Sequence, residues 1–111
     1  MQTTSYSPSL WIQAYNRGVS AQATETIILD KINVLGFQNF SVSMTCYSGT
    51  VTTSSIYASA DGVNYYLVHS GGISGLTAGN TAQYTFTSIN VYLRITATGI
   101  STFDCYLVGD A

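Results

Sequence analysis

The stretch that decides the fold runs from residue 40 to residue 47 and reads Phe40-Ser41-Val42-Ser43-Met44-Thr45-Cys46-Tyr47. Apolar and hydroxyl-bearing side chains alternate throughout it, which is the period of a β-strand with one buried face. Similar alternation returns at residues 82–87 and 91–98, and the sequence shows no helical period. The sequence therefore predicts an all-β chain.

Turn residues separate these segments at spacings of about 8–12 residues, which is typical of β-sandwiches. Asp61-Gly62 predicts a tight hairpin, because this dipeptide suits turns with positive backbone φ. The glycine-rich segment 70–80 predicts a loop. We expect a single antiparallel β-sandwich of seven to eight strands over residues 10–111, with jelly-roll and Ig-like topologies both open.

The first nine residues are polar and contain too little apolar surface to belong to the core. We expect them to form an arm that docks on a neighbouring molecule. The segment lacks the basic and apolar regions of a signal peptide, so we expect synthesis without a secretion signal. The residues assigned to docking are Gln2, Thr3, Thr4, Ser5, Tyr6, Ser7 and Pro8.

The chain carries few charges: three basic and five acidic residues among 111. Soluble surfaces usually hold about 25–35% charged residues. Exposed strands without Lys or Glu invite pairing with other strands, so we expect copies of the chain to associate. The basic residues Arg17, Lys31 and Arg94 are too scattered for nucleic acid or an anionic membrane, and we expect neither partner.

The residue types that catalysis needs are also scarce. His69 is the only histidine, and no neighbour in sequence could activate a nucleophile with it or complete a metal site. We expect no enzymatic activity, metal or cofactor. On the polar face of its strand, Arg94 is expected to pair with Asp104 and to play a structural role.

Two cysteines, Cys46 and Cys105, each share the inward face of a predicted strand with large apolar residues. Buried free thiols are one interpretation, because free cysteine behaves as a small apolar residue. A disulfide is the other, and closing a loop of about 60 residues would stabilise the fold by about 4 kcal/mol. We favour the reduced state.

Aromatic residues offer a contact surface for copies of the chain, because Tyr and Trp combine apolar area with a polar tip. The candidates are Trp11, Tyr15, Tyr57, Tyr66 and Tyr92. The same residues would serve a carbohydrate-binding module if they were exposed and coplanar, so a glycan stays open as a ligand.

The hairpin Ser59-Ala60-Asp61-Gly62-Val63-Asn64-Tyr65 and the later strand Tyr92-Leu93-Arg94-Ile95-Thr96-Ala97-Thr98-Gly99 carry a resemblance. Together they resemble small jelly-roll subunits of tailed-phage particles and of bacterial surface appendages and, more weakly, discoidin-like sandwiches. The resemblance covers about the C-terminal half. It implies a structural subunit of a larger assembly.

We therefore expect a non-enzymatic, homo-oligomeric structural protein. The first hypothesis is a decoration or minor capsid protein of a phage virion, assembled in the host cytoplasm. The alternatives are a subunit of a filament on a bacterial cell or spore surface, and a carbohydrate-binding module.

Overall fold

The computed structural model describes residues 2–7 and 11–111 and contains no helix within them. Every strand pairing is antiparallel. The expected all-β antiparallel fold is therefore confirmed. The strands are β1 (Gln2–Ser7), β2 (Trp11–Ala21), β3 (Thr26–Asn33), β4 (Asn39–Ser59), β5 (Tyr66–Thr77), β6 (Thr81–Thr87), β7 (Tyr92–Thr98) and β8 (Ser101–Asp110).

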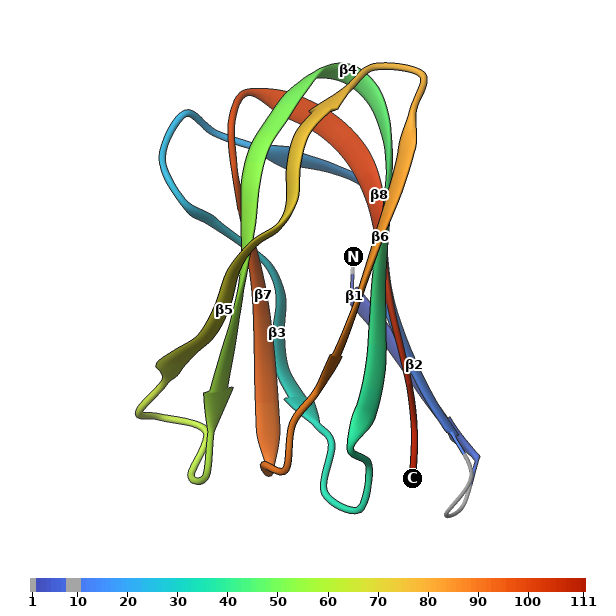
Figure 1. Cartoon of the computed structure of the whole chain (residues 1–111), viewed down its shortest axis with the longest axis vertical. Helices are drawn as coiled ribbons and strands as arrows, with labels where there is room; N and C mark the ends of the chain where they lie inside the picture. The colour runs from blue at the N-terminus through green and yellow to red at the C-terminus, as the bar shows by residue number, and fades with distance from the viewer. Residues whose placement is uncertain (1, 8–10) are drawn as a thin grey trace.

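Four long segments build the two layers: β2–β3, β4, β5–β6 and β7–β8. Each of them bends near its middle, so that one half lies in each layer. β4 runs up one layer and continues over the upper end into the other (Figure 1). The pair β5–β6 follows it on one side and the pair β7–β8 on the other, and β2–β3 lies beyond β7–β8. Layer A therefore has the order β1-β2-β8-β4-β6, and layer B has the order β5-β4-β7-β3. This is a jelly-roll topology with β1 added at one edge, and it excludes the Ig-like alternative.

Two glycines make the fold-over of the sheet sterically feasible. Gly49 in β4 and Gly99 in the β7–β8 turn have φ values of 71° and 113°. A Cβ on Gly49 would lie 2.1 Å from the carbonyl oxygen of Ile100, and one on Gly99 would lie 2.4 Å from that of Thr50. Only glycine permits both the positive φ and this approach of two backbones.

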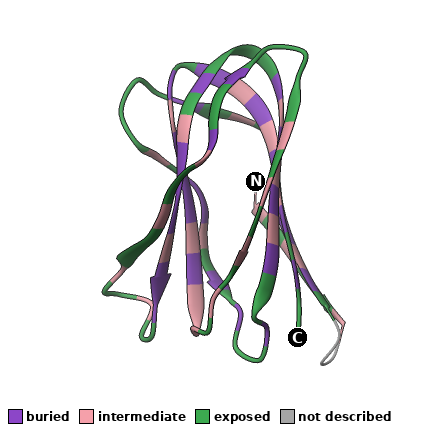
Figure 2. Ribbon diagram, in the orientation of Figure 1, coloured by how far each residue is buried: buried purple, intermediate pink, exposed green. Residues whose placement is uncertain are grey.

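The core lies between the two layers and is built from alternate residues of each strand. Along β4 the inward residues Phe40, Val42, Met44 and Cys46 are buried, as the alternation predicts. Buried residues alternate with more exposed ones along the central strands (Figure 2). From the other layer, Leu93 and Ile95 are fully buried, so both layers contribute to one core.

Two local predictions were wrong. The Asp61-Gly62 turn is not a tight two-residue hairpin: six residues, 60–65, connect β4 to β5. The glycine-rich segment 70–80 is not a loop either, because β5 extends through it to Thr77 and only residues 78–80 turn. Register shifts in the β4–β5 pairing accommodate the glycines, so the segment keeps its strand pairing despite its composition.

Candidate functional site

The segment expected to be a free docking arm is a strand of the fold. Residues 2–7 form β1, which pairs along its whole length with residues 11–16 of β2. The segment lacks core residues, as expected, but its backbone gains hydrogen bonds by adding to the sheet. Of the predicted arm, Met1, Pro8 and Ser9 lie outside the described residues.

Three of the four strands at the sheet edges contain no charged residue. β1 and β6 end layer A, and β5 ends layer B, as the pairings show. None of these three strands includes Asp, Glu, Lys or Arg. Proteins usually protect such edges with charges, proline or bulges, because an edge strand presents unpaired N–H and C=O groups. These edges lack the charge protection.

The fourth edge strand is β3, and side chains from layer A form hydrogen bonds with its backbone. The Gln2 amide donates from Nε2 to the Asp30 carbonyl oxygen at 2.8 Å, and its Oε1 accepts the Asp30 N–H at 2.7 Å. The Tyr6 hydroxyl donates to the Asn33 carbonyl oxygen at 3.0 Å. Lys31 has a φ of 50°, and the pairing of β3 with β7 shifts register twice. This edge is therefore irregular and already bonded.

Along the opposite side of the sandwich, aromatic rings close the space between β5 and β6. His69 stacks on Tyr84 with ring centroids 4.4 Å apart, and Tyr84 lies 6.1 Å from Phe86. Phe86 in turn stacks on Phe40 at 5.3 Å. His69 thus takes part in ring packing at an edge of the fold.

Exposed apolar residues concentrate at the start of β5. Tyr66 and Leu67 are 53% and 54% exposed, and Val68 is 36% exposed. They are consecutive and therefore lie on both faces of an edge strand. An apolar, uncharged edge of this kind is suited to pairing with another strand.

The predicted aromatic contact surface is not a single surface. Trp11 and Tyr15 lie on β2 in layer A, whereas Tyr57 and Tyr92 lie on β4 and β7 in layer B. Tyr66 lies at the free edge, where its hydroxyl accepts a hydrogen bond from Asn90 at 2.7 Å. Strand alternation alone does not show which layer a residue joins.

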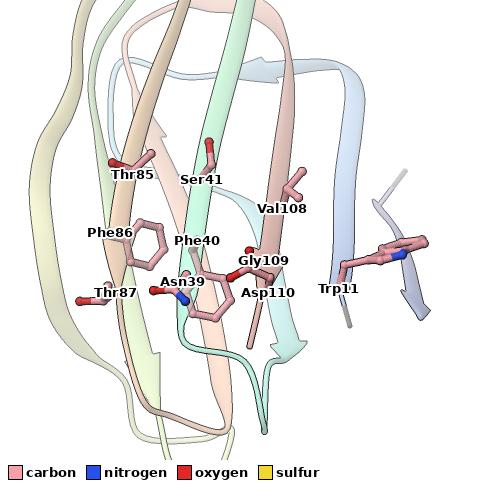
Figure 3. A pocket seen from close by; sticks show the side chains of 10 residues that line it. All are labelled: Trp11, Asn39, Phe40, Ser41, Thr85, Phe86, Thr87, Val108, Gly109 and Asp110. Atoms are coloured by element: carbon pink, nitrogen blue, oxygen red, sulfur yellow. The ribbon is translucent and has the colours of Figure 1, made fainter. Parts of the chain in front are cut away.

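A hollow of about 640 Å³ lies at one end of layer A (Figure 3). The Phe40 and Phe86 rings lie toward one side of it, and Trp11 stands apart on β2, with β8 between them. Its other lining residues are Asn39, Ser41, Thr85, Thr87, Val108, Gly109 and Asp110. Trp11 does not stack with the two phenylalanines, so the rings make no coplanar platform.

Both cysteines are buried and unpaired. They lie on the neighbouring strands β4 and β8, where Cys105 is opposite Met44 and Cys46 is opposite Phe103. Burial raises the pKa of the Cys105 thiol to about 12. Desolvation disfavours the thiolate, so this thiol is a poor nucleophile at neutral pH.

Asp61 organises the loop between β4 and β5. Its Oδ1 accepts hydrogen bonds from the N–H groups of Val63 and Asn64 at 2.8 and 2.9 Å. The bond from the Asn64 N–H is the largest cause of a pKa well below the usual aspartate value. Gly62 has a φ of 78°, the positive value that the turn residues predicted.

Arg94 does not pair with Asp104, contrary to the prediction. Its Nε donates to Asp30 Oδ1 at 2.8 Å, and both residues belong to layer B. Asp104 lies in layer A and accepts hydrogen bonds from the Tyr47 hydroxyl and the Gly18 N–H. The error arose because the two layers separate β7 from β8, although they are consecutive in sequence.

Within residues 2–7 and 11–111, no three His, Cys, Asp or Glu side chains gather as a metal site would need. The same residues contain no helix long and apolar enough to cross a membrane.

Comparisons with known proteins relate this chain to others through structure. No protein-family model matches it, and no curated protein matches its sequence. One solved structure, described as "Bacillus endospore appendages form a novel family of disulfide-linked pili", is similar with a TM-score of 0.58 and 16% identity. The match covers 100% of this chain and 90% of that one, so the two share a fold.

A second structure, described as "CBM4 structure and function", aligns with a TM-score of 0.37 and 13% identity over 88% of this chain and 68% of its own. This likeness is too weak to carry an argument. Neither description mentions a phage particle.

Proposed function

We propose that this protein is a structural, non-catalytic subunit of a filament on a bacterial cell or spore surface. Its copies would join by pairing their edge strands. The observation that carries the proposal is the absence of charged residues from β1, β5 and β6. The full-length fold likeness to an endospore appendage protein supports a filament over a phage particle.

The position of these strands explains how a filament could grow. The uncharged edges lie on both lateral sides of the sandwich, with β1 on one side and β5 and β6 on the other. If an edge on one side pairs with an edge on the other side of the next copy, the contact is heterologous. Such contacts extend without limit when the rotation between copies does not close a ring.

The proposal needs no covalent link between copies. The similar appendage protein is described as forming disulfide-linked pili. Here both cysteines are buried in the core of one subunit. We therefore assign assembly to backbone hydrogen bonds and apolar contacts along the edges.

A charge placed on β5 tests the proposal. The variant Leu67→Lys puts a desolvated cation into any contact that uses this edge, so filaments should be lost or greatly shortened. Val63→Lys is the matched control, because Val63 is 76% exposed in the adjacent loop and belongs to no strand. Electron microscopy and sedimentation would measure assembly, and circular dichroism would verify the fold.

We expect the wild type and Val63→Lys to form polymers and Leu67→Lys to sediment as a small species. A wild type that stays at 11.9 kDa at high concentration would overturn the proposal of self-assembly. Equal assembly of Leu67→Lys and the wild type would remove β5 from the contact.

A further inference from the structure

The outer face of layer B holds a pocket beside the β5 edge. We call it the Arg94 pocket, and its volume is about 360 Å³. Two connections reach it from opposite ends of the sandwich: the β2–β3 connection supplies Glu25, and the β4–β5 connection supplies Tyr65. Strand residues complete the lining, which consists of Glu25, Ile27, Tyr57, Tyr65, Arg94 and Thr96.

Glu25 is held in place by two hydroxyl groups. Its Oε2 accepts hydrogen bonds from the Tyr57 hydroxyl and from Thr96 Oγ1, both at 2.7 Å. The bond to Glu25 is the largest cause of a raised pKa at Tyr57. Within the described part of the chain, Oε1 of Glu25 has no hydrogen-bond partner, so a positioned carboxylate oxygen is available to a ligand.

On the other side of the pocket, the Arg94 side chain is also held in place by two contacts. Its Nε bonds to Asp30, and its guanidinium carbon lies 3.9 Å from the centre of the Tyr65 ring. Its terminal amino groups form no hydrogen bond with the residues that the structure describes. A guanidinium fixed by an ion pair and a ring loses little freedom when these groups bind a ligand.

The Tyr65 hydroxyl is a second, independent sign of a binding site. It is the one buried side-chain oxygen or nitrogen in residues 2–7 and 11–111 that has no hydrogen-bond partner. Such a group is costly to leave unsatisfied. Because Tyr65 lines the Arg94 pocket, a ligand or water molecule bound there is a candidate partner for this hydroxyl.

The charges in the pocket select the class of ligand. Glu25 disfavours an anion, and the guanidinium of Arg94 disfavours a cation. Adjacent hydroxyl groups on one ring can donate to the carboxylate and accept from the guanidinium at the same time. Ile27, which is 50% exposed, offers an apolar wall for ring carbons.

We infer that the Arg94 pocket binds one neutral pyranose unit of a saccharide. Its volume lies at the small end of the range of about 300–1,000 Å³ that is typical of ligand pockets, which fits one ring rather than an oligosaccharide. The pocket opens on the outer face of layer B and neighbours the β5 edge, because Tyr57 pairs with Leu67.

Saturation-transfer NMR with the full chain tests the inference, because it detects weak binding to small and large assemblies alike. The probes are glucose, galactose and N-acetylglucosamine at millimolar concentration. Ile27→Arg would fill the pocket, and Ile100→Arg is the matched control because Ile100 is 73% exposed and does not line the pocket. Glu25→Gln removes the charge of the acceptor while keeping its size.

We expect at least one probe to receive saturation from the wild type and from Ile100→Arg, and none from Ile27→Arg. Glu25→Gln should bind about tenfold more weakly or worse, as the loss of a charged hydrogen bond implies. If circular dichroism shows that Ile27→Arg is unfolded, the comparison of Glu25→Gln with the wild type alone tests the inference. No transfer to any probe, or equal transfer from Glu25→Gln and the wild type, would overturn the inference.

Discussion

Replacing Gly49 by alanine should weaken the fold at the point where β4 passes from one layer to the other. The added Cβ would lie 2.1 Å from the Ile100 carbonyl oxygen and 3.0 Å from the Ser101 Cα. Both are backbone atoms, so no side-chain rotation can relieve the contact. The strands must separate, which breaks the hydrogen bond of 3.2 Å from the Thr50 N–H to the Ile100 carbonyl oxygen.

The expected cost in free energy of unfolding has three parts. The positive φ of 71° costs a residue with a Cβ about 1 kcal/mol. The lost hydrogen bond costs about 1 kcal/mol. Displaced packing around the bend adds about 1 kcal/mol or more. We therefore expect Gly49→Ala to lose about 3 kcal/mol.

Gly18→Ala is the matched control. Gly18 has a similar φ of 60°, but a Cβ there would have no heavy atom within 4 Å. It should lose only the conformational part, about 1 kcal/mol. The entropy that alanine removes from the unfolded chain is the same at both positions, so it cancels in the comparison. The difference of about 2 kcal/mol reports the backbone contact alone.

Urea and thermal unfolding followed by circular dichroism would measure this difference. The background should be Leu67→Lys, so that assembly does not contribute to stability. A difference of about 2 kcal/mol corresponds to roughly 8 °C in Tm for a domain of this size. If the two variants unfold within about 0.5 kcal/mol of each other, close contact at the bend is not what requires glycine at position 49.

Two further predictions concern the buried thiols and the carboxylate of Asp61. Because Cys46 and Cys105 are buried and unpaired, both should titrate as free thiols after denaturation and should resist iodoacetamide in the native protein. A reductant should leave the Tm unchanged. Rapid labelling of the native protein would contradict the burial of the thiols. The lowered pKa of Asp61 favours its ionised form in the folded state, so its contribution is present above the unfolded pKa of 3.8 and is lost as the pH falls below it. Asp61→Asn should therefore lose less stability than the wild type between neutral and acid pH. Equal acid profiles for Asp61→Asn and the wild type would refute the role of the loop hydrogen bonds.

The sequence by itself determined the features that depend on neighbouring residues. The alternation from Phe40 to Tyr47 predicted which side of the strand is buried, and Asp61-Gly62 predicted a positive φ. Alternation in their two strands likewise predicted that Cys46 and Cys105 point into the core. These features follow from strand period and turn chemistry, which act over a few residues.

Composition also predicted uncharged edges, but only the tertiary structure decided which strands they are. The polar segment 2–7 became a strand because β2 offered it backbone partners, and the glycine-rich part of β5 was held by its pairing with β4. Neither pairing leaves a signal within the segment itself.

The Arg94 pocket shows the same limit for the candidate site. Arg94 pairs with Asp30, 64 residues earlier, and Thr96 holds Glu25, 71 residues earlier. Arg94 and Asp104 are closer in sequence, yet the fold-over at Gly99 places them in different layers. Ion pairs and pockets depend on distances in space that the folded sheet sets, whereas strand periodicity fixes only the side to which each residue points.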